Sequence, residues 1–225
     1  YPRCIRGNAV ARFEAAFASD SGVRHWVGCG NGTDAIYAVL RALDIGPGDE
    51  VITVANSWIS TSETIGQTGA RPVFVDVELE SRNLQAGPVE SALSNQTRAG
   101  LPVHFAGLPV DMQPIHDLLR ETDILVLEDA AQAIGTRYQE HKIGSSGNPV
   151  AFSFHANKNM TTIAYREQGR KLASLIRVAV LTIPGTIHSG RQPRIDDQFN
   201  CPRGVALNAD ADGSSDERRV GKGGR

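Results

Sequence analysis

Apolar positions over residues 8–162 fall into two kinds of segment. Short runs that are apolar almost throughout, such as residues 50–55 and 150–154, alternate with longer stretches whose apolar residues recur at helical spacing, such as residues 35–43. Continuously apolar runs are typical of strands buried on both faces of a parallel sheet, and the helical spacing is typical of helices that cover such a sheet. The pattern therefore predicts the α/β class, with a mainly parallel, helix-covered sheet.

The individual elements follow from these segments and from the turn residues between them. We expect strands at residues 25–30, 50–55, 72–77, 124–129 and 150–154, the third of them buried, and a strand followed by a turn at residues 101–107. We expect helices at residues 8–18, 35–43, 89–93 and 111–120, and the start of a further helix within residues 56–65.

The α/β pattern ends near residue 163. Residues 164–225 contain more basic than acidic residues, whereas residues 1–163 contain more acidic ones, and residues 208–225 have almost no apolar periodicity. Such a composition is typical of loops or disorder. We therefore expect a large domain at residues 1–163 and an atypical tail at residues 164–225, for which a frameshifted or truncated reading frame is our hypothesis.

Composition and charge argue against several classes of function. The net charge is −2 and no block of five or more like charges occurs, so we expect neither nucleic acid nor a membrane surface as partner. The cysteines Cys4, Cys29 and Cys201 form no Cys-x-x-Cys pair, which predicts neither a disulfide framework nor a metal site. The charge favours a small-molecule partner, and the cysteine usage fits a reducing cytoplasm. Neither a signal peptide nor a membrane span is predicted.

Lys158 is the candidate covalent residue. It follows the apolar run at residues 150–154 by four positions, which places it beyond a strand end, where α/β proteins bind ligands. A lysine there could form a Schiff base with a carbonyl cofactor such as pyridoxal 5′-phosphate (PLP). The alternative is an ordinary solvated surface lysine.

Asp129 ends the apolar run at residues 124–129 and is the candidate partner of Lys158. A carboxylate at this place can hold a pyridinium N–H and keep the ring nitrogen protonated, so that the ring accepts electrons from a carbanion. The alternative is that Asp129 caps a helix beginning at Ala130.

Two further segments carry candidate contacts. Around Asn31 and Gly32, a strand, a glycine turn and a helix follow one another, and a helix N-terminus offers free N–H groups to a phosphate. The alternative there is a tight turn without a ligand. His104 follows a later apolar run and could face a cofactor, although a hydrogen-bonded scaffold residue is the more common case.

Five motifs, taken in order, resemble the DegT-type sugar aminotransferases, which are PLP enzymes of fold type I. The motifs are GNGTD at residues 30–34, GPGDEVI at residues 46–52, PVH at residues 102–104, EDAAQ at residues 128–132 and FSFHANKN at residues 152–159. The likeness covers residues 7–162. Within the family, the last motif is most similar to the subgroup that makes UDP-4-amino-4-deoxy-L-arabinose.

The resemblance implies a set of cofactor contacts by matching position. Lys158 would be the covalent anchor and catalytic base, Asp129 would hold the ring nitrogen, and Gln132 would bond the phenolic oxygen. Trp58 would stack on the ring, the alternative being a partly buried core residue. His155 follows the subgroup's pattern, with its role open. The remaining implied contacts, to the phosphate, are Gly32, Thr33, Asp34 and Ser153.

The resemblance also implies a reaction. An amino acid, expected to be glutamate, would donate its amine through PLP to a keto group on a nucleotide-linked sugar, giving an amino sugar for cell-surface polysaccharide or lipopolysaccharide. Family sites usually close between two subunits, so a homodimer is implied. No small C-terminal domain is recognisable after Thr162, so we expect little activity from the chain as it stands. Two alternatives stay open: a PLP-dependent sugar dehydratase, in which histidine replaces the lysine, and a non-catalytic remnant that serves as a binding or interaction piece.

Overall fold

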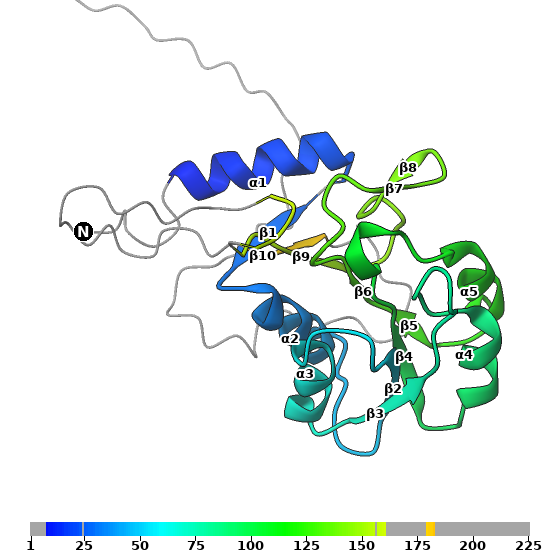
Figure 1. Ribbon diagram of the computed structural model, residues 1–225. Coiled ribbons are helices and arrows are strands. Elements are labelled where there is room, and N and C mark those ends of the chain that lie inside the picture. The colour runs from blue at the N-terminus through cyan, green and yellow to red at the C-terminus, as the bar shows by residue number, and fades with distance from the viewer. Residues whose placement is uncertain (1–7, 24, 156, 161–178, 183–225) are drawn as a thin grey trace, which may run out of the picture. The chain divides into compact units, whose positions relative to one another are not determined.

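The computed structural model describes residues 8–23, 25–155, 157–160 and 179–182, all within one compact unit that spans residues 1–193. Helices and strands alternate along the chain as the sequence predicts (Figure 1). The helices are α1 (Asn8–Ser21), α2 (Gly32–Ala42), α3 (Ser60–Thr68), α4 (Ala86–Ala92) and α5 (Met112–Leu119), with a 3-10 turn η1 (Phe105–Gly107). The strands are β1 (Trp26–Cys29), β2 (Glu50–Val54), β3 (Arg71–Val75), β4 (Thr97–Leu101), β5 (Leu125–Val126), β6 (Glu128–Asp129), β7 (Arg137–Tyr138), β8 (His141–Lys142), β9 (Val150–Ser153) and β10 (Ala179–Thr182).

The main strands form two ladders, in the orders β1-β10-β9-β6 and β3-β2-β4-β5. The ladders adjoin because β5 and β6 follow each other directly in the chain, and a parallel bridge between Val103 and Asp129 also links them. The pairs β2–β3, β2–β4, β4–β5 and β6–β9 are parallel, whereas β10 runs antiparallel to both of its neighbours. The prediction of a mainly parallel sheet is confirmed.

Helices pack on both faces of the sheet, because successive side chains of a strand point to opposite faces. In β2, Val51 belongs to a core shared with α2 and α3, whereas Ile52 and Val54 belong to a core shared with α4 and α5. A third core joins α1 to β1, where the rings of Phe17 and Trp26 stack with centroids 4.7 Å apart. None of the helices in the described ranges is long and apolar enough to span a membrane.

β3 corrects one prediction. The sequence predicts a buried strand at residues 72–77, but β3 is the edge strand of its ladder, and Phe74 is 51% exposed. The physical reason is that β3 pairs with β2 on one side and has no strand on the other among the described residues. Pro72 fits this place, since proline lacks the N–H that a central strand needs.

β10 lies in the part of the chain that the sequence predicts to be an atypical tail. Residues 179–182 pair with Val150–Ser153 of β9 on one side and with Trp26–Cys29 of β1 on the other. This short stretch of the expected tail is therefore a strand of the sheet. The other residues beyond 160 lie outside the described part of the chain, and the division at residue 163 stays a prediction.

Candidate active site

Asp129 lies at the carboxyl end of β6 and is 6% exposed. Its Oδ2 accepts a hydrogen bond from the Thr61 hydroxyl at 2.9 Å, and its Oδ1 accepts one from the Ala131 N–H at 3.1 Å. Burial raises the pKa of Asp129, and these two donors together with the charge of Lys158 oppose that rise only in part. A cation bound next to Asp129 would therefore stabilise its ionised carboxylate further.

No helix begins at Ala130, so the interpretation of Asp129 as a helix cap is wrong. Residues 131–136 form turns, in which the Ala133 N–H donates to the Ala130 carbonyl and the Thr136 N–H donates to the Ala133 carbonyl. The contact from Ala131 to Asp129 closes a local turn. Small residues after a buried strand do not by themselves indicate a helix.

Lys158 lies in a turn after β9, where its N–H donates to the His155 carbonyl at 2.9 Å. Its side chain is partly buried, and its charge acts on Asp129. The other lysine of the described residues, Lys142, instead pairs with Asp20 at 2.8 Å. The two strand ends therefore bring an acid and an amine into one site, as their positions in the sequence predict.

The N-terminus of α2 lies against the end of β9. A Cβ added to Gly32, the first residue of α2, would lie 3.3 Å from the Cβ of Ser153, closer than most side-chain carbons approach. Glycine therefore allows the free N–H groups of the helix to lie beside the Ser153 hydroxyl. This arrangement of helix N-terminus and hydroxyl suits a phosphate group.

Thr33 and Asp34 are held in place at the start of α2. The Thr33 hydroxyl donates to Ser60 Oγ at 2.9 Å, which links α2 to the first residue of α3. Asp34 completes the helix cap: its N–H donates to Asn31 Oδ1, and its carboxylate accepts from Asn31 Nδ2, both at 2.9 Å. The cap uses both groups of Asp34, so a direct contact of Asp34 with phosphate stays a prediction.

Gln132 presents an amide donor. Its Oε1 accepts from the Ala106 N–H at 2.8 Å, and because a backbone N–H can only donate, the oxygen end of the amide is fixed. The other end of the Gln132 amide is therefore its NH₂ group, which can only donate. Ala106 and the following Gly107 both have left-handed backbones, with φ of 52° and 85°, which directs this N–H toward Gln132. A hydrogen-bond donor here suits a phenolic oxygen.

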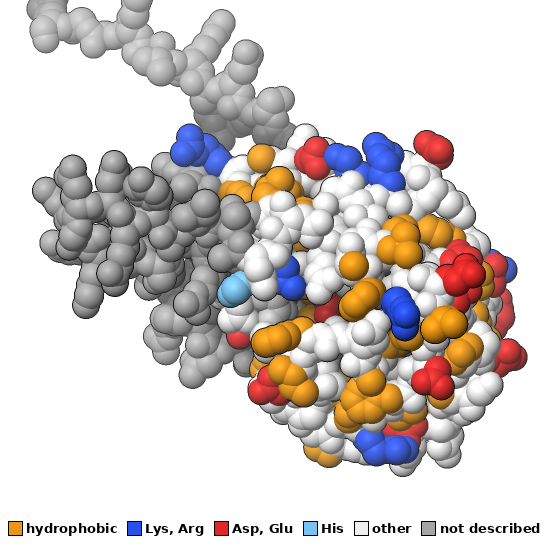
Figure 2. All heavy atoms as spheres, in the orientation of Figure 1, with side chains coloured by type: hydrophobic (Ala, Val, Ile, Leu, Met, Phe, Trp, Pro, Cys, Tyr) orange, Lys and Arg blue, Asp and Glu red, His pale blue; other side chains and the backbone are white. Residues whose placement is uncertain are grey.

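Trp58 lies between β2 and α3 and is 73% exposed, so its interpretation as a partly buried core residue is wrong. Its carbonyl accepts from the Thr61 N–H at 3.0 Å, which holds the start of α3 close to the indole. Figure 2 shows hydrophobic side chains among polar ones on the face where α2 and α3 lie in Figure 1. An exposed indole beside Asp129's partner Thr61 is available to a planar ligand.

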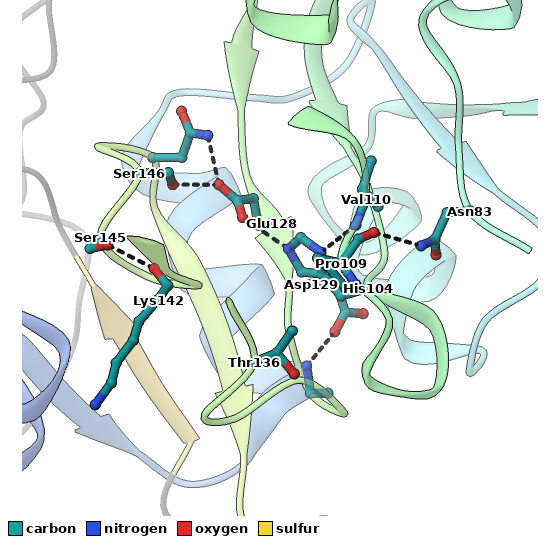
Figure 3. Close-up of polar contacts among 12 residues, drawn as sticks. Asn83, His104, Pro109, Val110, Glu128, Asp129, Thr136, Lys142, Ser145 and Ser146 are labelled. Atoms are coloured by element: carbon teal, nitrogen blue, oxygen red, sulfur yellow. Dashed lines mark hydrogen bonds and ion pairs between the residues drawn. The ribbon is translucent and has the colours of Figure 1, made fainter. Parts of the chain in front are cut away.

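His104 is part of the scaffold. Its ring is fully buried, its Nδ1 accepts from the Val110 N–H at 3.0 Å, and its Nε2 lies 2.9 Å from Glu128 Oε2 (Figure 3). Since Nδ1 accepts, Nε2 carries the proton and donates to Glu128. Both ring nitrogens are used within the protein, so the scaffold alternative describes His104 and the cofactor-facing one does not.

Glu128 precedes Asp129 in β6 and is also fully buried. Besides the bond from His104, its Oε1 accepts from Ser146 and from Asn148, each at 2.7 Å. Burial acts to raise the pKa of Glu128, but the hydrogen bonds from His104, Asn148 and Ser146 outweigh burial and leave that pKa lowered. Glu128 therefore anchors the strand that carries Asp129.

His155 is exposed, and its Nδ1 lies 2.8 Å from Asn157 Oδ1. Its N–H donates to Ser153 Oγ at 3.4 Å, so the residue orders the turn between Ser153 and Lys158. Nothing in these contacts assigns His155 a chemical role.

No group of three or more potential metal ligands occurs among the described residues.

Sequence reasoning missed Thr61 and Ser60, the hydroxyl partners of Asp129 and Thr33. Both residues lie in the first turn of α3, and residues 55–59 separate that helix from the strand β2. The signal available was a run of Ser and Thr at a helix start beyond a buried strand, which by itself more often indicates capping. Only the packing of α3 beside β6 shows which carboxylate Thr61 meets.

Comparison with known proteins identifies the family. Residues 2–164 match the DegT/DnrJ/EryC1/StrS aminotransferase family, and the chain belongs to this family. It is 43% identical over 179 residues to the UDP-N-acetyl-3-dehydro-α-D-glucosamine 3-aminotransferase of Acidithiobacillus ferrooxidans, a match that covers 76% of this chain and 48% of that protein. It is 42% identical over 156 residues to the GDP-perosamine synthase of Caulobacter vibrioides, covering 69% of this chain and 42% of that protein.

Among solved structures, the chain is similar to NtdA from Bacillus subtilis with its cofactor PMP bound. The TM-score is 0.70 at 28% identity, and the match covers 80% of this chain and 38% of that one. The resemblance to this aminotransferase family is therefore confirmed. The chain spans less than half the length of each of these relatives.

Proposed function

We propose that this chain is the cofactor-binding part of a PLP-dependent aminotransferase that transfers an amine from an amino acid to a nucleotide-linked keto sugar. The observation that carries the proposal is that Asp129 ends β6 and Lys158 follows the neighbouring parallel strand β9, with the charge of Lys158 acting on the buried Asp129 carboxylate. A buried carboxylate whose pKa is raised by burial, beside a lysine, suits a cofactor that brings a cationic ring nitrogen and a reactive carbonyl. The family membership of the chain supports the same conclusion.

The residues of the site fit this cofactor. Its phosphate would lie at the N-terminus of α2, where Gly32 allows close approach and the Ser153 hydroxyl is adjacent. Gln132 would donate its amide N–H to the phenolic oxygen, and Trp58 would cover one face of the ring. When bound, PLP supplies an electron sink for the carbanion at the reacting carbon.

Two side chains then carry the chemistry of the protein. Lys158 would hold the cofactor covalently and, as the base of the site, would move a proton from the α-carbon of the amino donor to the cofactor. Asp129 would keep a proton on the ring nitrogen, because that charge would stabilise its carboxylate. Thr33, Asp34 and the N-terminus of α2 would hold the phosphate.

The substrate class rests on the relatives. One is named for a 3-dehydro sugar on UDP and another for perosamine on GDP, so a sugar joined to a nucleoside diphosphate is their common feature. We further propose that glutamate is the amino donor and that the protein acts as a homodimer in the cytoplasm. The amino sugar would be used in cell-surface polysaccharide or lipopolysaccharide. The last motif, at residues 152–159, is most similar to the aminoarabinose subgroup, whereas one relative is named for a 3-dehydro sugar, so the proposal leaves the position of the keto group open.

Reconstitution with PLP tests the proposal. The purified chain should bind PLP with a visible absorbance band, and borohydride reduction followed by peptide mapping should place the label on Lys158. A protein that binds no PLP would instead support the non-catalytic remnant. Label on Lys142 or Lys171 would contradict the assignment of the anchor, and the presence of Lys158 already argues against the dehydratase alternative.

A further inference from the structure

The segment that joins β2 to α3 contacts three parts of the candidate site. Trp58 exposes its indole, Ser60 accepts from Thr33 at the start of α2, and Thr61 donates to Asp129. Thr61 is almost completely buried, so its hydroxyl reaches Asp129 without competition from bulk water. One short segment thus connects the phosphate end of the site to the carboxylate end.

The direction of these hydrogen bonds can be worked out. An ionised carboxylate only accepts, so the Thr61 hydroxyl gives its single proton to Asp129 Oδ2. Ser57 Oγ lies 2.7 Å from Thr61 Oγ1, and since Thr61 has no second proton, Ser57 is the donor of that pair. The chain of bonds runs from Ser57 to Thr61 to Asp129.

We propose that Thr61 is a positioning residue for Asp129: its hydroxyl fixes the rotation of the carboxylate and holds it ionised, ready to pair with a ring nitrogen. The Ala131 N–H holds the other carboxylate oxygen of Asp129, so the Thr61 hydroxyl is the side-chain group that restricts the remaining rotation of the carboxylate. The part of the inference that concerns the ring nitrogen rests on the proposed function. The contact between Thr61 and Asp129 does not.

Thr64 provides a matched control in the same helix. It is as buried as Thr61, but its hydroxyl donates to the carbonyls of Ser60 at 2.8 Å and Thr61 at 3.1 Å. Thr64→Val therefore removes a buried hydroxyl from α3 without touching Asp129. Thr61→Val removes the hydroxyl that Asp129 uses, and Thr61→Ser keeps it.

Two other charged or titratable groups act on Asp129, and neither is altered by these variants. They are Lys158, in the turn after β9, and His104, in the loop after β4, whose backbone N–H donates to the Asp129 carbonyl at 3.0 Å. The ring of His104 is held between Glu128 and Val110. A change in the titration of Asp129 between Thr61→Val and Thr64→Val is therefore due to the Thr61 hydroxyl.

The deciding experiment is a carbon-13 NMR titration of the Asp129 carboxyl in the chain without cofactor, with the signal assigned by its loss in Asp129→Asn. Thr61→Val should move the titration midpoint upward, whereas Thr61→Ser and Thr64→Val should stay near the wild type. Equal midpoints for Thr61→Val and Thr64→Val would overturn the proposal. Should Thr61→Val fail to fold, Thr61→Ala gives the same comparison with a smaller side chain.

Cofactor binding provides the second readout. Loss of a hydrogen bond to a charged group should weaken PLP binding about tenfold in Thr61→Val, with recovery in Thr61→Ser. The pH at which the visible band changes should move in Thr61→Val and not in Thr64→Val. A wild-type chain that binds no PLP would defeat the proposed function, while the NMR titration would still decide whether Thr61 holds Asp129.

Discussion

Glu128 and Asp129 are adjacent carboxylates on the same two-residue strand, yet their environments are opposite. Glu128 accepts hydrogen bonds from three side chains, and its pKa is lowered. Asp129 accepts from Thr61 and from a backbone N–H, and its pKa is raised. Because successive residues of a strand face opposite sides, one strand delivers one carboxylate to the scaffold and the other to the site.

The comparison shows how a structural carboxylate differs from one that is available to a ligand. A carboxylate has about four acceptor positions, and Glu128 fills three of them from within the protein. Asp129 fills two with donors from the described residues and lies beside Lys158. Its remaining capacity and its raised pKa are what a cationic N–H of a ligand would use.

Lys158→Ala should have the largest effect on the Asp129 side of the comparison. The variant should lose all borohydride-stabilised label while unfolding at the same denaturant concentration as the wild type, because Lys158 lies in a turn and contributes little to the core. Peptide mapping and a urea titration measure the two quantities. The matched variant Lys142→Ala, at a surface ion pair, should keep the label; label that persists in Lys158→Ala would refute the anchor.

Glu128→Gln should destabilise the fold by about 3 kcal/mol, since a buried donor without an acceptor costs about 1–3 kcal/mol. The amide NH₂ must face either the His104 N–H or the Asn148 NH₂, both of which are donors, and on the second side only the Ser146 hydroxyl can turn to accept. His104 cannot switch tautomer freely, because its Nδ1 accepts from Val110. Urea unfolding measures the loss, and an unchanged midpoint would show that the network is not important for stability.

The pH dependence of stability should have opposite signs for the two carboxylates. The pKa of Glu128 is lowered on folding, so its contribution is present above its unfolded pKa of about 4.3 and is lost as the pH falls through the folded value. The pKa of Asp129 is raised on folding, so its contribution is present below about pH 3.9 and is lost as the pH rises through the folded value.

Unfolding curves from pH 3 to pH 8 check these signs. The deficit of Glu128→Gln relative to the wild type should shrink on acidification below about pH 4. The wild type should lose stability relative to Asp129→Asn as the pH rises from about 4 toward neutrality. Parallel curves for both variants would mean that neither carboxylate changes its pKa on folding.

Asp129→Asn should lower transamination more than cofactor binding in a form of the protein that carries out the reaction. The fold tolerates the amide, since its oxygen can accept from Ala131 while its NH₂ donates to Thr61, whose proton turns toward Ser57. The lost charge matters most when the carbanion forms, so transamination should fall further than PLP affinity. Equal losses in the two quantities would make Asp129 a structural residue only.

The sequence predicts most of the helices and strands, because they follow from local periodicity. It places one strand too late in the chain, within residues 101–107, whereas β4 spans Thr97–Leu101 and residues 105–107 form the turn η1. It places Lys158 and Asp129 at one sheet edge, where the structure finds them together. The sequence does not predict the features that depend on which strands pair and how helices pack. The edge position of β3 and the strand β10 depend on which segments pair, and the partner of Thr61 depends on how α3 packs.

Trp58→Ala should have the smallest effect. This variant tests whether a side chain of the site affects cofactor binding without affecting the stability of the fold. Because Trp58 is 73% exposed, removal of its indole should leave the unfolding midpoint unchanged, in contrast to Glu128→Gln. If the ring stacks on PLP, affinity for the cofactor should fall by about 0.5–1.5 kcal/mol, and Trp58→Phe should recover most of it. Fluorescence titration with PLP measures the change. An affinity equal to that of the wild type would show that the exposed indole serves a surface other than the cofactor site.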